Sequence, residues 1–169
     1  MDWIFLSISL KSKAQSEIGY NRDEALRCAK AVRAFQSTFQ PKKFAKYDIS
    51  AGGKTLNKPV MGVKLKVTLD AMLMETKEDV VSAGGITMLY AFSADRPDLK
   101  DRLSAMAGLV LWALEDGQMP PLPRLCMAVD IAETKIVKAS ASHQRFRERV
   151  EASCREVAAQ WGDIEPPHD

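Results

Sequence analysis

The sequence predicts an α+β fold in which an antiparallel sheet carries helices on one face. Residues 3–10 and 63–70 alternate apolar and polar side chains, which is the period of a half-buried strand. Residues 21–39, 95–116 and 142–161 repeat apolar side chains every three or four positions, as an amphipathic helix does. With the weaker elements between them, the order along the chain fits a ferredoxin-like arrangement with an added C-terminal hairpin and helix.

The N-terminal part is expected to form a strand over 3–10 and then a helix from Asn21. Asn21 can cap this helix, and Glu24 stands three residues further on, as in a capping box. Pro41 ends the helix, because proline lacks the backbone donor that a helix interior needs. A short strand is expected over 43–49.

A second helical segment is expected from Thr76 to Tyr90. Asp79 stands three residues after Thr76, which is the spacing of a helix start. Gly84 and Gly85 weaken this helix, since glycine costs about 1 kcal/mol against alanine in a helix interior. If the helix breaks there, residues 86–93 are expected to form a strand instead.

The C-terminal part is expected to contain a central helix, a β-hairpin and a final helix. The central helix ends at Gly117, and its second half is apolar on nearly all sides, which is typical of a buried helix. The hairpin pairs 124–131 with 134–140. The final helix runs over 142–161, and its apolar stripe is expected to be buried: Phe146, Val150, Cys154, Val157 and Trp161.

Length and composition predict one folded domain. The chain has 169 residues, of which 46% are hydrophobic and 27% charged, which is ordinary for a globular protein. We expect a single domain over 1–162 and a mobile polar tail over 163–169. The apolar N-terminus has no basic leading segment, and the longest apolar run elsewhere is shorter than the roughly 18 residues of a membrane span. These observations predict a cytoplasmic protein without membrane contact.

Cysteine and histidine are too few and too scattered for the common metal sites. Cys28, Cys126 and Cys154 are isolated, without any CxxC pair, so we expect reduced thiols. The two histidines, His143 and His168, are too few for a Ser-His-Asp triad or a histidine-based metal site to be expected. The sequence therefore predicts no metal and no cofactor.

The stretch SAGGKT, residues 50–55, looks like the end of a phosphate-binding loop. A complete loop reads G-x-x-x-x-G-K-[ST] and opens a helix whose N-terminal amides bind the phosphates. Here Asp48 stands where the first glycine is required, and Pro59 and Gly62 disfavour a following helix. We interpret the segment as a turn between strands that binds no nucleotide.

Charge is divided unevenly along the chain. Residues 1–70 contain 13 Lys or Arg against 6 Asp or Glu, a net charge of +7, whereas residues 71–169 contain 11 against 16, a net charge of −5. Such asymmetry can mark a nucleic-acid surface, an acidic protein partner, or attraction between two halves of one fold. The candidate nucleic-acid-binding residues are Arg27, Lys30, Arg33, Lys42, Lys43, Lys46, Lys64 and Lys66.

The leading hypothesis is a non-enzymatic cytoplasmic binding protein whose basic N-terminal half contacts nucleic acid or an acidic protein partner. The first alternative is a small enzyme with a carboxylate-based site around Asp130, which is the candidate catalytic residue because it lies within an apolar strand. The second alternative is a structural subunit that self-associates through its apolar segments into a homo-oligomer.

Overall fold

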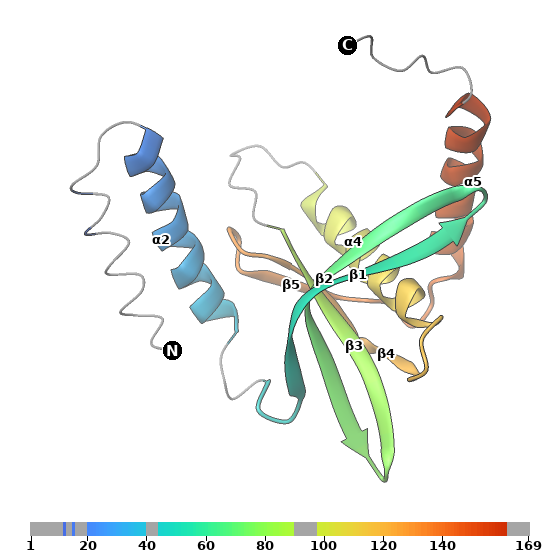
Figure 1. Cartoon of the computed structure of the whole chain (residues 1–169), viewed down its shortest axis with the longest axis horizontal. Coiled ribbons are helices and arrows are strands. Elements are labelled where there is room, and N and C mark those ends of the chain that lie inside the picture. Colours follow the sequence, from blue (N-terminus) through green and yellow to red (C-terminus); the bar gives the residue numbers. More distant parts are fainter. Residues whose placement is uncertain (1–11, 13–14, 16–19, 40–43, 90–97, 162–169) are drawn as a thin grey trace.

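In the part of the chain that the structure describes, the fold is a strongly curled five-stranded sheet with helices packed on it (Figure 1). The computed structural model describes residues 12, 15, 20–39, 44–89 and 98–161. Its elements are α2 (Tyr20–Thr38), β1 (Asp48–Val60), β2 (Val63–Lys77), β3 (Val80–Leu89), α4 (Leu99–Leu114), β4 (Pro121–Asp130), β5 (Lys135–Lys138) and α5 (Gln144–Gln160).

The sheet has the strand order β1-β2-β3-β4-β5 and mixed strand directions. Neighbouring strands are antiparallel except β3 and β4, which are parallel and are connected through α4. A parallel pair needs such a crossover, because a tight turn can only reverse the chain. The predicted α+β class is confirmed. The purely antiparallel sheet is wrong at the β3–β4 pair, and the ferredoxin-like arrangement is not confirmed, since the sheet curls into a half-barrel.

Helices cover both faces of the sheet, so the prediction of a single covered face is wrong. Cys126 and Ala128 on β4 pack in the cluster that contains the buried side of α4. The alternate residues Met127 and Val129 belong to a second cluster, against which Phe35 of α2 packs. Because successive strand residues point to opposite faces, α4 and α2 lie on opposite sides of the sheet.

Two predictions for the C-terminal part are confirmed. The hairpin is formed by β4 and β5, which pair antiparallel. The central helix is α4, and it packs against β3, β4 and β5. Its buried residues are Leu103, Ala107, Gly108, Val110, Leu111, Trp112, Ala113 and Leu114.

A tight hairpin replaces the helix expected from Thr76 to Tyr90. β2 continues to Lys77 and β3 begins at Val80, so only Glu78 and Asp79 connect the two strands. Both residues have positive φ, 50° and 66°, as in the hairpin turns that match the twist of a sheet. The sequence gives no Asn-Gly or Asp-Gly signal at this position, and for this reason the turn was not expected.

The SAGGKT segment lies inside strand β1, so its prediction as a turn is wrong. The ladder with β2 shifts register between Ala51 and Lys54, which marks a β-bulge, and Gly53 has a φ of 87°. Gly52 lies against the backbone of Asp70, where an added Cβ would be 2.0 Å from the carbonyl carbon. The chain continues as a strand after Lys54, so the segment does not open the helix that a phosphate-binding loop requires.

Helix α5 confirms the predicted helix but not its predicted burial. In Figure 1 it stands out from the sheet, at the end of the molecule opposite α2. Cys154 is buried, whereas Phe146 and Val150 are half-buried. Val157 and Trp161 are 42% and 69% exposed. Part of the apolar stripe therefore lies at the surface, where the prediction had it buried.

Some expectations fall outside the described residues. These are the strand over 3–10, the possible strand beyond Leu89, the tail over 163–169 and the candidate residues Lys42 and Lys43. Within the part of the chain that is described, no helix has the length and apolar character needed to cross a membrane.

Candidate functional site

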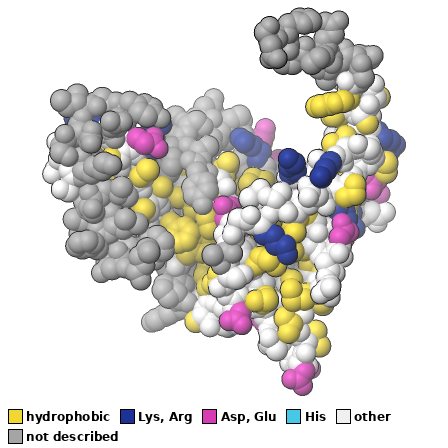
Figure 2. Space-filling view, in the orientation of Figure 1, with side chains coloured by type: hydrophobic (Ala, Val, Ile, Leu, Met, Phe, Trp, Pro, Cys, Tyr) yellow, Lys and Arg dark blue, Asp and Glu magenta, His cyan; other side chains and the backbone are white. Residues whose placement is uncertain are grey.

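An open groove runs between the start of β2, the first half of α4 and one side of α5. Its volume is about 590 Å³. In Figure 2, hydrophobic side chains and Lys or Arg side chains lie beside one another over α5 and the nearby β1–β2 hairpin. We call it the α4–α5 groove, lined by Val63, Leu65, Asp101, Arg102, Ala105, Phe146, Arg149, Val150, Ser153, Cys154 and Val157.

The alternation of β2 supplies one wall of the α4–α5 groove. Val63 and Leu65 point toward α5, where they pack against a cluster that contains Cys154. Lys64 and Lys66 occupy the alternate positions and are exposed on the other face of the strand. The pattern that identified β2 in the sequence therefore also separates an apolar groove wall from a basic outer face.

A side-chain contact between α5 and α4 forms part of the second wall. Phe146 lies against Gly108, where an added Cβ would be 2.9 Å from the ring. That distance is shorter than ordinary van der Waals contact, so a larger residue at this position would force the Phe146 ring to shift. The glycine thus leaves room for this ring on the surface of α4.

Charge in the α4–α5 groove is predominantly positive. Arg102 and Arg149 line it, and Asp101 is the one carboxylate among the lining residues named above. Asp101 lies in the first turn of α4, where the helix dipole favours a negative charge. The two arginines are both exposed, so they remain accessible to a ligand that enters the groove.

A cluster centred on Trp112 holds the groove walls together. The Lys58 Nζ lies 5.5 Å from the centre of the Trp112 ring, and the Arg147 guanidinium carbon lies 5.3 Å from it. Lys58 also pairs with Asp116 at 2.6 Å, and Arg147 pairs with Glu115. These contacts join β1, α4 and α5 and neutralise two carboxylates at the C-terminal end of α4, where the dipole disfavours them.

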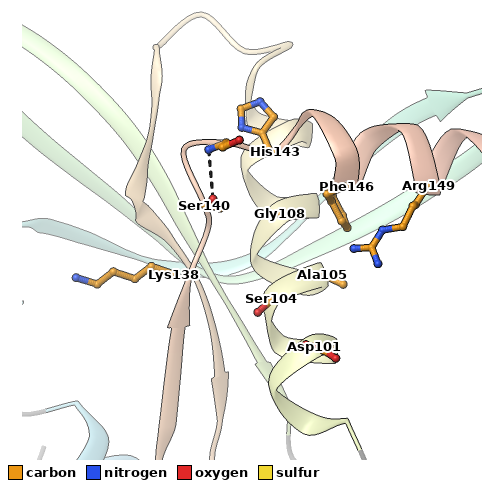
Figure 3. Close-up of a pocket in the computed structure, with 10 residues that line it drawn as sticks. Asp101, Ser104, Ala105, Gly108, Lys138, Ser140, His143, Phe146 and Arg149 are labelled. Carbon is orange, nitrogen blue, oxygen red and sulfur yellow. Dashed lines mark hydrogen bonds between the residues drawn. The ribbon is translucent and has the colours of Figure 1, made fainter.

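A smaller polar pocket lies at the start of α5 (Figure 3). Its volume is about 270 Å³, and its ionisable lining residues are Asp101, Lys138, His143 and Arg149. In Figure 3 the Lys138 side chain points away from α5, on the far side of α4 from Arg149. Because the charged ends do not converge, this pocket offers no arrangement for acid–base catalysis.

Aromatic rings close the sheet face on the α2 side. Phe35 of α2 and Phe39, which follows the end of this helix, have ring centres 4.5 Å apart, and the Phe39 ring centre lies 5.2 Å from that of Phe44. Phe44 in turn lies 6.2 Å from Tyr47. The rings line an apolar pocket of about 440 Å³ together with β-strand residues. They attach α2 to the sheet through packing.

Asp130 stabilises the turn between β4 and β5. It is fully buried, and its Oδ1 accepts a hydrogen bond of 2.6 Å from the backbone N–H of Glu133. It lines none of the three pockets described above. This geometry is that of a turn-stabilising aspartate. The enzymatic role stays a prediction.

The basic candidate residues divide between two ends of the molecule. Arg27, Lys30 and Arg33 lie on α2, whereas Lys64 and Lys66 lie near the far end of the β1–β2 hairpin. These two elements stand at opposite ends in Figure 1. The Nζ atom of Lys46 lies 4.0 Å from the Oε1 atom of Glu75. Sequence reasoning thus identified the charges, but it could not place them on one surface, and it did not select Arg102 and Arg149.

Cys126 is an unreactive buried thiol. Burial raises its pKa to about 12, against a smaller opposite effect of a hydrogen bond with the Gly85 backbone. A thiol with this pKa is almost entirely protonated near neutral pH and is a poor nucleophile. Among the described residues, no cluster of three or more His, Cys, Asp or Glu side chains could hold a metal ion.

No protein-family model matches this chain, and no curated protein does either.

Proposed function

We propose that this protein is a non-enzymatic binding protein that holds an acidic, amphipathic segment of a partner protein in the α4–α5 groove. The observation that carries the proposal is an open apolar groove lined by two exposed arginines, Arg102 and Arg149, and by one carboxylate, Asp101. Apolar lining supplies affinity through burial of the partner's apolar side chains, and the arginines select glutamate or aspartate beside them. An amphipathic helix laid in a groove is a recurring form of such recognition.

The exposure of the groove residues supports this proposal. Val157 is 42% exposed, and Trp161 beyond it is 69% exposed. Apolar side chains beside a groove lose contact with water when a partner covers them, and this contributes roughly 25 cal/mol per Å² of apolar area. Exposed tryptophan is also the residue type most enriched among the strongest contacts of protein interfaces.

The distribution of basic residues favours an acidic protein over nucleic acid. Duplex DNA binding gains affinity from several cations that contact phosphates along one continuous surface. Here the basic residues of α2 and those of β2 stand at opposite ends of the molecule. Lys64 and Lys66 remain as a small basic group on the outer face of β2. We therefore propose an acidic protein partner, and the experiment below includes a DNA probe to test nucleic-acid binding as the alternative.

Fluorescence polarisation tests the proposal with three labelled probes. The first is an amphipathic peptide with leucines at helical spacing and glutamates on its flanks, and the second carries lysines in place of the glutamates. The third is a short DNA duplex. We expect the acidic peptide to bind about tenfold or more tightly than the basic peptide, a difference of about 1.4 kcal/mol or more.

Variants of the groove residues test whether the peptide binds in the α4–α5 groove. Reversing both Arg102 and Arg149 to glutamate should weaken the acidic peptide by about tenfold or more. Arg155→Glu is the matched control, because Arg155 is exposed on the same helix but does not line the groove. Equal loss in the control would contradict the proposal. So would tight DNA binding that depends on Lys64 and Lys66 while the acidic peptide does not bind.

A further inference from the structure

We infer that the amphipathic segment held in the α4–α5 groove is helix α5 of a second copy of this chain, so that the protein forms a symmetric dimer. This inference rests on the proposed function of the groove. It identifies the partner from α5 itself, whose apolar stripe is incompletely covered and whose flank carries an exposed carboxylate, Glu156.

The apolar stripe of α5 continues past the part that its own fold covers. Val150 and Val157 are seven residues apart, about two turns of helix, so they lie on the same side. Both line the groove, and Ser153 lies midway between them. A small residue at the centre of a stripe lets two helices approach closely. The stripe therefore has the shape of a helix-pairing face.

One flank of this stripe carries one positive and one negative side chain, so it can pair with the same flank of a second copy. Arg149 and Glu156 are also seven residues apart, so they share a flank, one turn on either side of the stripe's centre. Both are exposed, and neither takes part in an ion pair within the described residues. A helix with this flank pairs best with an antiparallel copy of itself.

A two-fold axis between Ala152 and Ser153 satisfies both patterns at once. It places two α5 helices antiparallel, with Arg149 of each copy level with Glu156 of the other. Val150 then lies about one turn or less from Val157 of the second copy. The antiparallel arrangement also brings the C-terminal end of each helix dipole near the N-terminal end of the other, which is favourable.

Sedimentation of the full chain tests the dimer. With rising concentration, we expect the mass to increase from the 18.7 kDa of one chain toward twice that value. Arg149→Glu alone or Glu156→Arg alone places two like-charge pairs in the interface, so each should weaken the dimer by about a hundredfold. Mixing the two variants should restore it, because both pairs in the mixed dimer are again of opposite sign. Arg155→Glu should leave the dimer unchanged.

The outcomes separate this inference from the proposed function. A chain that stays monomeric while the unrelated acidic peptide binds the groove overturns the inference and leaves the proposed function intact. A dimer that is insensitive to both charge reversals, or a mixture that does not restore it, also overturns the inference. If the charge reversals weaken the dimer and their mixture restores it, the inference holds. If the unrelated peptide nevertheless does not bind, the proposed binding of a partner protein is overturned.

Discussion

The ammonium group of Lys58 lies 5.5 Å from the centre of the Trp112 ring and 2.6 Å from the Oδ1 atom of Asp116. Lys58 belongs to β1, near its turn to β2, and Trp112 is buried in α4. Arg147 of α5 lies near the same ring. The three contacts tie the β1–β2 hairpin to both helices, and so they fix the width of the groove between them.

Lys58→Gln should lower the free energy of unfolding by about 1–2 kcal/mol. The side chain is 13% exposed and loses both its ring contact and its ion pair with Asp116. Urea unfolding of this variant measures the effect. Lys46→Gln is the matched control, because Lys46 also lies over a ring but is mostly exposed, and it should cost less. Equal costs would contradict the importance of the Trp112 cluster.

Gly84→Ala should destabilise the protein by more than about 1–3 kcal/mol, the usual cost of overpacking. The added Cβ would lie 2.2 Å from the Leu125 Cβ and 2.5 Å from its backbone oxygen, neither of which can move away without shifting β4. Gly53→Ala is a useful comparison, since that site has open space but a positive φ of 87°. Thermal unfolding should show the larger loss for Gly84→Ala, and the reverse order would contradict the close strand approach.

The thiols should differ in reactivity. With iodoacetamide at pH 8, we expect Cys28 to be alkylated in the folded protein and Cys126 and Cys154 to be protected until unfolding. Mass spectrometry of the labelled protein counts the modified sites. Rapid labelling of Cys126 in the folded state would show that it is accessible, in contradiction to its complete burial.

Cys126 also gives a pH dependence with a definite sign. Its pKa is raised from an ordinary 9.0 to about 12 by burial, so the unfolded chain loses this proton first as pH rises. The contribution to stability is complete below about pH 9 and is lost progressively toward pH 12. Between pH 9 and 11, the wild type should therefore lose more stability in urea than Cys126→Ala does. Parallel losses in the two proteins would exclude this linkage.

Trp161→Ala should change folding stability by less than about 0.5 kcal/mol when it is measured in the monomeric Glu156→Arg background. The side chain is 69% exposed, so truncation leaves no cavity. Leu111→Ala is the control for a buried position and should cost about 2–5 kcal/mol. A comparable cost for Trp161→Ala would show that the apolar stripe of α5 is part of the core, as its sequence pattern first suggested.

Periodicity predicted the elements that contain many residues of one pattern. The alternation over 63–70 identified β2, and the recurring apolar residues of 95–116 identified α4. The hairpin at Glu78 and Asp79 was missed because it uses positive φ without a glycine or asparagine. Gly84, which was interpreted as a weak point of a helix, serves the close packing of two strands.

The candidate site was harder to predict than the fold. Helical spacing shows that Val157 and Trp161 share a side of α5, but the same spacing fits a buried core and an exposed groove equally well. The net charge of +7 over residues 1–70 predicted a binding surface in the N-terminal half. The groove arginines Arg102 and Arg149 instead belong to the acidic half of the sequence. Only the packing of α5 against α4 and β2 brings these residues together.

The central claim, that the α4–α5 groove binds an acidic amphipathic segment, is tested most directly by an NMR titration of the Glu156→Arg variant with the glutamate-flanked peptide. This variant is expected to be monomeric and keeps every lining residue of the groove. We predict that the amide shifts concentrate at Leu65, Ala105, Ser153 and Val157. Shifts confined to the outer face of β2 around Lys66, or no shifts at saturating peptide, would contradict the account.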